Sequence, residues 1–210
     1  MTATTTLSST RRALHAVAEL LIAGPQYAAA GDIRLAARPG GFGGVTAGSA
    51  AVSGTVLVTT TGRFPLGGRL IELAELAGIT PRPLRDVYQG GPEFTLDEPL
   101  NVDPGDADVL LQAFTDGDAA LRMLAPEQEP VLWPEHFDIG ISLGEINFGV
   151  SPGDLSIDLP YAYVGSWNVP SGPFWNQPFG AARPMSEFAT PKDIVRFFDE
   201  GTRAARASRG

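Results

Sequence analysis

The segment 136–151 constrains the fold more than any other part of the sequence, because apolar and polar residues alternate along it. Such a period of two is typical of β-strands that bury one face. The Leu143-Gly144 pair lies in the middle and suits a tight turn. We therefore predict an antiparallel hairpin with strands at 137–143 and 145–150.

A two-residue turn at Leu143-Gly144 would also fix the register of this hairpin. The predicted partners are Ile141 with Ile146, Ile139 with Phe148, and Phe137 with Val150. All of the apolar side chains then lie on one face, which we expect to be buried.

The opposite face of the hairpin is rich in hydrogen-bonding groups, namely those of His136, Asp138, Ser142, Glu145, Asn147 and Ser151. Gly140 and Gly149 lie on the same face and leave room near the backbone, so a small molecule could lie there. The alternative is the solvated face of an ordinary antiparallel sheet. If His136 and Asp138 share a strand face, the carboxylate could orient the imidazole for acid–base catalysis near neutral pH.

Aromatic residues flank the hairpin, and the set comprises Trp133, Tyr161, Tyr163, Trp167, Phe174, Trp175 and Phe179. Alternation places Tyr161, Tyr163 and Trp167 on one face of a strand at 160–167, while Trp175 lies in a proline-rich loop that could cover them. Together with Ser142, Glu145, Asn147 and Ser151, these four are candidate ligand-binding residues. A buried aromatic cluster is the alternative.

Metal binding and covalent catalysis have little support in the sequence. There is no cysteine, which excludes disulfides and thiolate ligands. Glu135 is expected on the face opposite His136, and neither an HExxH pattern nor a GxSxG nucleophile elbow is present. We predict no metal site, and no cofactor can be named. His15, beside an apolar helical stripe, is expected to be a packed structural histidine.

Composition narrows the class of protein. A chain of 210 residues with 43% hydrophobic residues can build the core of one domain. The formal net charge of -9 disfavours nucleic acid as a partner. No long apolar run and no signal-peptide pattern are present, so we expect a cytoplasmic protein without a membrane segment.

Two further strands are expected at 32–38 and 51–60, paired with each other. The PGGFGG sequence at 39–44 is interpreted as a flexible turn, with a ligand-facing lid as the alternative. It lacks the spacing of a phosphate-binding loop. Residues 80–102 show no clear period.

Four helices are predicted from helical spacing and capping residues. The first spans residues 10–23, with Ser8 or Ser9 as its cap and Gly24-Pro25 as its stop, and the second spans residues 67–77 and ends at Gly78. The third begins at Pro104 and is expected to break at Gly117. The last follows Thr190-Pro191, with Thr190 and Asp193 as a capping box.

These elements together predict an α+β fold, with an antiparallel sheet of about five strands and helices packed on one face. We expect a single domain over 1–210, with residues 1–8 flexible and residues 203–210 a frayed tail.

The order of several segments resembles a family of bacterial proteins known only as a domain of unknown function. The segments are ALHAVAEL, DIRLAARP, HFDIGISL, FGVSPGD, PYAYV and TPKDIVRFFDEGTRAA. The resemblance covers both ends and the central hairpin, but not the region from about Ser49 to Glu129. It implies no activity, cofactor or catalytic residue.

The sequence supports two functional hypotheses. In the first, a small molecule binds between the polar face of the 136–151 hairpin and the loop from Trp167 to Phe179, with His136 and Asp138 as candidate catalytic residues. In the second, a non-catalytic protein uses exposed aromatic residues as a contact patch for a partner or for a homodimer. Neither identifies a ligand or a reaction.

Overall fold

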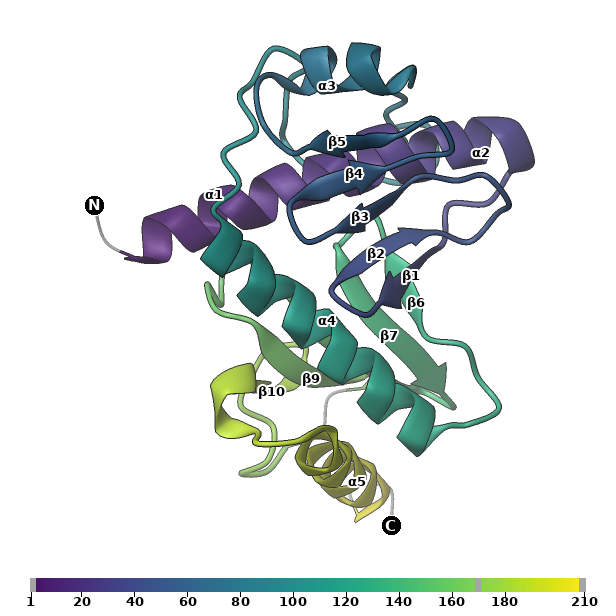
Figure 1. The fold of residues 1–210 in the computed structure, drawn as a ribbon. Coiled ribbons are helices and arrows are strands. Elements are labelled where there is room, and N and C mark those ends of the chain that lie inside the picture. The colour runs from purple at the N-terminus through teal and green to yellow at the C-terminus, as the bar shows by residue number, and fades with distance from the viewer. Residues whose placement is uncertain (1–2, 169–170, 208–210) are drawn as a thin grey trace. The chain divides into compact units, whose positions relative to one another are not determined.

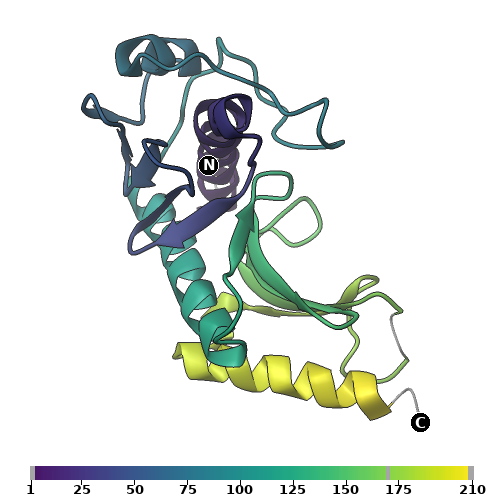
Figure 2. The same cartoon turned by 90° about the vertical axis from the view of Figure 1, so that its right-hand side faces the viewer.

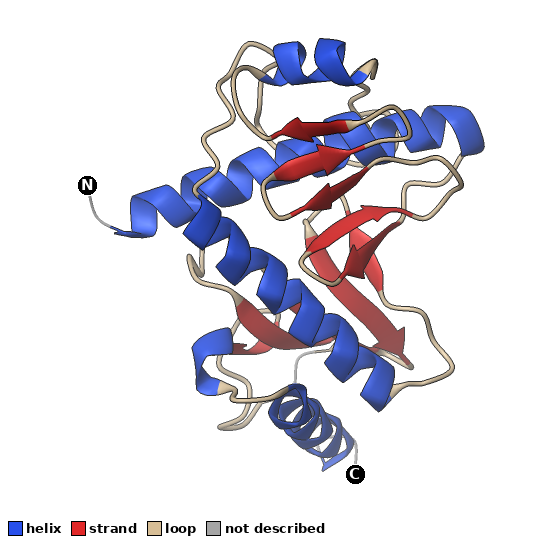
Figure 3. Ribbon diagram, in the orientation of Figure 1, coloured by secondary structure: helices blue, strands red, loops and turns tan. Residues whose placement is uncertain are grey.

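The computed structural model of the chain describes residues 3–168 and 171–207. Helices and antiparallel strands make up the fold, which confirms the α+β class (Figure 3). The chain divides into a first unit, Met1–Gln112 with Leu132–Phe137, and a second unit, Ala113–Val131 with Asp138–Gly210. The expectation of a single domain over 1–210 stays a prediction.

The sheet is larger than expected, with ten strands among the described residues instead of about five. Their hydrogen-bonded order is β10-β9-β8-β7-β6-β1-β2-β3-β4-β5. The strands of the first unit are β1 (Leu35–Arg38), β2 (Gly41–Gly44), β3 (Ala51–Ser53), β4 (Val56–Val58), β5 (Arg63–Pro65) and the end of β6 (Val131–Trp133). With three or four residues each, they are too short to show a clear period of two.

The glycine-rich segment 39–44 is not the flexible turn that we expected, because β2 occupies most of it and is buried throughout. The segment 51–60 is also not one strand. Gly54 adopts a left-handed φ of 56° and turns the chain from β3 into β4. Consequently β3 pairs with β2, and not with β1 as predicted.

The first unit begins with one long helical rod, purple in Figure 1. It comprises α1 (Ala3–Ala16), a π-helix (Val17–Ala23) and α2 (Gly24–Ala30). The predicted cap at Ser8 or Ser9 and the stop at Gly24-Pro25 are therefore wrong. In a π-helix each N–H bonds five residues back, as Gly24 N does to the Glu19 carbonyl.

Proline does not stop this helix because its missing hydrogen bond is replaced from outside. In a π-helix the N–H of residue 25 would bond the carbonyl of Leu20, but proline has no N–H to donate. That carbonyl accepts a hydrogen bond from the backbone N–H of Arg82 at 3.0 Å. The carbonyl therefore keeps a donor, and the helix continues to Ala30.

After β5, α3 (Leu70–Ala77) ends where Gly78 takes a left-handed φ of 67°, as predicted. The chain then runs through turns and coil to α4, apart from an isolated bridge between Arg69 and Pro99. The structure thus shows no regular strand in the described segment 80–102.

The second unit is built on β7 (Asp138–Leu143), β8 (Ile146–Ser151), β9 (Tyr161–Ser166) and β10 (Gly180–Pro184). The predicted hairpin is confirmed, but its register is wrong by two residues. Its pairs are Leu143 with Ile146, Ile141 with Phe148 and Ile139 with Val150. Gly144, with φ of 62°, and Glu145 form the turn. A shift of two keeps each side chain on its predicted face.

Helices cover the apolar face of these strands, as expected for this unit. They are the second half of α4 (Pro104–Leu124) and α5 (Pro191–Ala207), the yellow helix in Figure 2. α4 continues through Gly117, so the predicted break is wrong. A Cβ at this position would lie 2.9 Å from Val150, and the glycine therefore allows the helix to pack closely on the sheet. Phe198 of α5 meets Phe148 edge-to-face, with ring centroids 5.5 Å apart.

One half of the predicted capping box of α5 is present, while the Asp193 N–H bonds the backbone carbonyl of Thr190 at 3.0 Å. Asp193 Oδ2 accepts hydrogen bonds from the backbone N–H of Thr190 at 3.0 Å and from its hydroxyl at 2.8 Å. The helix extends to Ala207, beyond the start of the expected frayed tail, and residues 208–210 lie outside the described part. A short 3-10 turn (Met185–Glu187) precedes it. No helix in the described part is long and apolar enough to cross a membrane.

Candidate functional site

The polar face of the hairpin is covered by a side chain of its own sheet. Tyr163 of β9 pairs in register with Gly149, which in turn pairs with Gly140. The Tyr163 hydroxyl donates a hydrogen bond to Asp138 Oδ2. A Cβ added at Gly149 would lie 2.5 Å from the Tyr163 hydroxyl, and one at Gly140 would lie 3.0 Å from it. The room that we expected the glycines to leave for a ligand is therefore filled by the tyrosine ring.

A second tyrosine extends this covered network. The Tyr161 hydroxyl donates to Asp154 Oδ2 at 2.6 Å, and the ring of Phe179 lies 6.3 Å from that of Tyr161 and 6.4 Å from that of Tyr163. Burial raises the pKa of both phenols, and their aspartate partners raise it further. Both hydroxyls therefore remain protonated donors near neutral pH.

His136 does not share a strand face with Asp138, so the geometric premise of the predicted catalytic pair is wrong. β7 begins only at Asp138. Phe137 has a left-handed φ of 53° and closes a turn in which its N–H bonds the Trp133 carbonyl at 2.8 Å. This turn interrupts the alternation of the strand. The side chain of His136 is 71% exposed, and its Nε2 lies 3.9 Å from Glu135 Oε2.

The other predicted ligand-binding residues are distributed over the second unit. Ser142 donates to Asn147 Oδ1 at 2.7 Å across the hairpin, and Glu145 is exposed in its turn. Ser151 is buried, and its hydroxyl accepts the N–H of Gly153 at 3.2 Å.

The two predicted tryptophans lie after β9. Trp167 follows its last residue and is 67% exposed, while Trp175 packs edge-on against Phe174 at 5.0 Å. The ligand-binding roles of these residues and the catalytic roles of His136 and Asp138 stay predictions.

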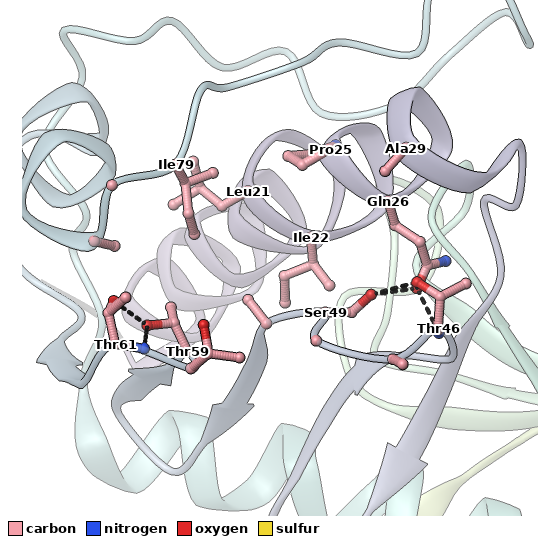
Figure 4. Close-up of a pocket in the computed structure, with 16 residues that line it drawn as sticks. Leu21, Ile22, Pro25, Gln26, Ala29, Thr46, Ser49, Thr59, Thr61 and Ile79 are labelled. Atoms are coloured by element: carbon pink, nitrogen blue, oxygen red, sulfur yellow. Dashed lines mark hydrogen bonds between the residues drawn. The ribbon is translucent and has the colours of Figure 1, made fainter.

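A pocket of about 270 Å³ lies in the first unit, at a place that the sequence analysis did not indicate (Figure 4). Leu21, Ile22, Pro25 and Ala29 of the helical rod form its apolar side. Two loops and the end of α3 complete it, and the loops contribute its hydroxyl groups. These lining residues are Thr46, Ala47, Gly48, Ser49, Ala50, Thr59, Thr60, Thr61, Ala77, Gly78 and Ile79.

Gln26 is the buried polar residue of this pocket, and it holds the loop after β2 in place. Its Oε1 accepts hydrogen bonds from the N–H of Val45 at 2.8 Å, the N–H of Thr46 at 3.1 Å and the hydroxyl of Ser49 at 3.0 Å. Its Nε2 donates to two backbone carbonyls between α2 and β1. Because both ends of the amide are engaged, Gln26 builds the pocket. The Ser49 hydroxyl donates to it and also bonds the Thr46 hydroxyl at 2.7 Å, so these hydroxyls face a ligand chiefly as hydrogen-bond acceptors.

Glu19 is a second feature that the sequence analysis missed. It is 4% exposed and lies in the π-helix. Short π-helical segments often occur at functional sites. Its carboxylate accepts hydrogen bonds from the Tyr88 hydroxyl at 2.7 Å and from the N–H of Leu84 at 3.3 Å. Burial raises its pKa. One acidic residue within the apolar run VAELLIA was the signal available in the sequence.

His15 is a packed histidine, as expected. Its Nε2 lies 2.7 Å from the Pro134 carbonyl oxygen, and its ring stacks on Phe137 with centroids 5.1 Å apart. Burial lowers the pKa of His15 from 6.5 to about 4. The imidazole is therefore neutral at physiological pH and donates to the carbonyl.

Comparisons with known proteins identify no relative from which a function could be inferred. No protein-family model, curated protein or solved structure matches the chain. The resemblance to an uncharacterised bacterial family stays a prediction. Among the described residues, no group of three or more histidine, aspartate or glutamate side chains is arranged to hold a metal ion.

Proposed function

We propose that the protein binds a small uncharged molecule in the pocket of the first unit. The observation that carries this proposal is the chemistry of the lining, which includes no Asp, Glu, His, Lys or Arg among its described residues. A charged ligand would lose its hydration there without gaining an opposite charge, which is strongly unfavourable. A neutral ligand avoids that cost.

The arrangement of apolar and polar groups narrows the ligand further. An apolar face would lie on Leu21 and Ile22, while a hydroxyl or carbonyl edge would meet the Thr46, Ser49 and Thr59 side. The volume of about 270 Å³ lies below the roughly 300–1,000 Å³ of drug-sized sites, so a monocyclic compound or a short chain fits best.

Binding is favoured over catalysis because the pocket offers no acid or base. Its serine and threonine hydroxyls have no histidine, lysine or carboxylate among the lining residues to activate them. The acid–base reaction considered for His136 and Asp138 assumed that both side chains lie on one strand face, and β7 begins only at Asp138. The proposal therefore keeps the expected small-molecule ligand but moves it to another site.

Ligand-detected NMR with four matched probes tests this proposal. Benzyl alcohol and phenol should bind, while benzoate and benzylamine, similar in size but charged, should bind at least about tenfold more weakly. The Ala29→Phe variant should abolish binding by filling the pocket. Ala28→Phe is the matched control, since Ala28 is also exposed on α2 but does not line the pocket. Equal binding of charged and neutral probes, or unchanged binding by Ala29→Phe, would contradict the proposal.

A contact surface on the second unit is the second candidate function. Trp167 is 67% exposed, and tryptophan is enriched among the residues that anchor protein–protein contacts. Sedimentation analysis of the wild type and of Trp167→Ser tests for a homodimer. A concentration-dependent dimer that the substitution weakens would support this function, and a monomer at all concentrations would contradict the homodimer.

A further inference from the structure

A second cavity, of about 260 Å³, lies within the second unit and is independent of the pocket in the first. It is formed by the loop before β10, by β10 itself and by α5. The residues that line it are Pro173, Phe174, Asn176, Ala182, Arg183, Phe197 and Glu200. We call it the Arg183–Glu200 pocket.

The polar side chains of this pocket divide into one structural residue and one charged pair. Asn176 is engaged by the backbone, because its Nδ2 donates to the Ala182 carbonyl at 3.0 Å and its Oδ1 accepts the Ala182 N–H at 2.9 Å. Arg183 and Glu200 thus remain as the polar side chains of the lining with capacity for a ligand.

Arg183 and Glu200 are held side by side. Arg183 Nη2 donates to Glu200 Oε2 at 2.9 Å, and its guanidinium carbon lies 4.9 Å from the centroid of the Phe197 ring. The ring fixes the guanidinium by a cation–π contact. This ion pair engages one of the five guanidinium N–H donors and one carboxylate oxygen. The side chains are 39% and 46% exposed, so a ligand can reach both.

We propose that the Arg183–Glu200 pocket binds an α-amino acid with an apolar side chain. The amino acid carboxylate would contact the guanidinium of Arg183, and its ammonium group would contact Glu200. These two groups are separated by one carbon in the ligand, and their protein counterparts are adjacent at 2.9 Å. The apolar side chain would lie against Phe174 and Phe197.

The pairing of charges is the reason for choosing a zwitterion. A simple anion would meet Arg183 but also the carboxylate of Glu200, and a simple cation would meet the reverse conflict. A zwitterion satisfies both, and the aromatic wall gives affinity for an apolar side chain. The pocket is thus matched in charge and in volume to one amino acid.

Calorimetric titration of the wild-type protein tests the proposal without any substitution. L-Phenylalanine should bind about tenfold or more tightly than phenethylamine, which lacks the carboxylate, and than 3-phenylpropionate, which lacks the ammonium group. The proposal fails if L-phenylalanine does not bind, or if either analogue binds as tightly as L-phenylalanine.

Substitutions then locate the site. Arg183→Gln and Glu200→Gln should each weaken L-phenylalanine binding about tenfold or more, while Arg196→Gln should leave it unchanged. Arg196 is a matched control because it lies on α5, as Glu200 does, and forms an ion pair with Asp193, but it does not line the pocket. Circular dichroism confirms that each variant is folded. Binding that survives both pocket substitutions would overturn the assignment, and binding lost in Ala29→Phe would place it in the first unit instead.

Discussion

Glu19 accepts a hydrogen bond from Tyr88 in the first unit, and Asp138 accepts one from Tyr163 in the second. Both carboxylates are at most 8% exposed. Their surroundings differ, because Tyr163 lies over two glycines of a regular sheet, while Tyr88 belongs to a segment without regular structure. One tyrosine fills a gap in a sheet, and the other fastens a loop to a π-helix.

This difference shows why the two regions offer different opportunities for binding. In the second unit, Tyr163 donates a hydrogen bond to Asp138 and leaves no room above the glycines of the hairpin. In the first unit, Glu19 and the Leu20 carbonyl hold the segment from Arg82 to Tyr88, while Leu21 and Ile22 of the same π-helix face the pocket. The tyrosine–carboxylate pair of the second unit thus covers the hairpin face, while the pair of the first unit holds a loop on the π-helix beside an open pocket.

The largest expected effect tests whether Tyr163 closes the hairpin face. Tyr163→Ala removes the ring above Gly149 and the donor to the buried carboxylate of Asp138, so the free energy of unfolding should fall by about 3–5 kcal/mol. Urea denaturation monitored by circular dichroism measures it. Tyr27→Ala, at a tyrosine that is 40% exposed, should change it by less than about 0.5 kcal/mol. Equal effects of the two substitutions would show that Tyr163 does not cover the sheet.

His15 should make the first unit sensitive to acid. Its pKa of about 4 in the folded protein is below its unfolded value of 6.5, so the unfolded chain takes up the proton more readily. The associated stability is present above pH 6.5 and lost as pH falls, by about 3 kcal/mol at pH 4. Unfolding free energies of wild type and His15→Gln should therefore converge or cross over this range.

The matched control for that titration is His136→Gln, at the exposed histidine. It removes an imidazole that is not buried, so it separates the effect of burying a histidine from that of losing one. If His15→Gln also parallels the wild type across this range, the burial of His15 is not what couples stability to pH.

Glu19 should give a pH dependence of the opposite sign. Its folded pKa is raised above 4.5, so its contribution to stability is complete below pH 4.5 and is lost as pH rises through the folded pKa. Glu19→Gln does not ionise, but it cannot accept both hydrogen bonds, at a cost of about 1 kcal/mol. The variant should therefore gain stability relative to wild type from pH 4.5 upwards. A difference in stability that stays constant from pH 4 to pH 8 would contradict this.

The smallest expected change in stability concerns the N-terminal cap of α5. Unlike the two tyrosine–carboxylate pairs, this cap depends only on residues close in sequence. Thr190→Ala removes the hydroxyl that bonds Asp193, so the unfolding free energy should fall by about 1 kcal/mol. Thermal unfolding measures the change, with Ser186→Ala at an exposed position as control. A loss as large as that of Tyr163→Ala would mean that the cap does more than begin α5.

Several elements were predictable because their signals are local. Alternation in 137–150 predicted the hairpin, and the Thr190–Asp193 pair predicted the start of α5. The register failed because a turn at Gly144-Glu145 and one at Leu143-Gly144 leave the same residues on the buried face. The extent of the first helix failed because Arg82, distant in sequence, supplies the hydrogen bond that Pro25 cannot.

The candidate sites depended on contacts between distant residues, and sequence alone could not provide them. Hydrophobic period and capping residues act within a few positions, so they determined the α+β class, the central hairpin and the last helix. Tertiary structure decided that Tyr163 fills the space over Gly149, that the helical rod, two loops and the end of α3 form a pocket lined by no charged side chain, and that Arg183 meets Glu200. Each of these is a packing relation between separate elements, fixed only when the strands and helices come together.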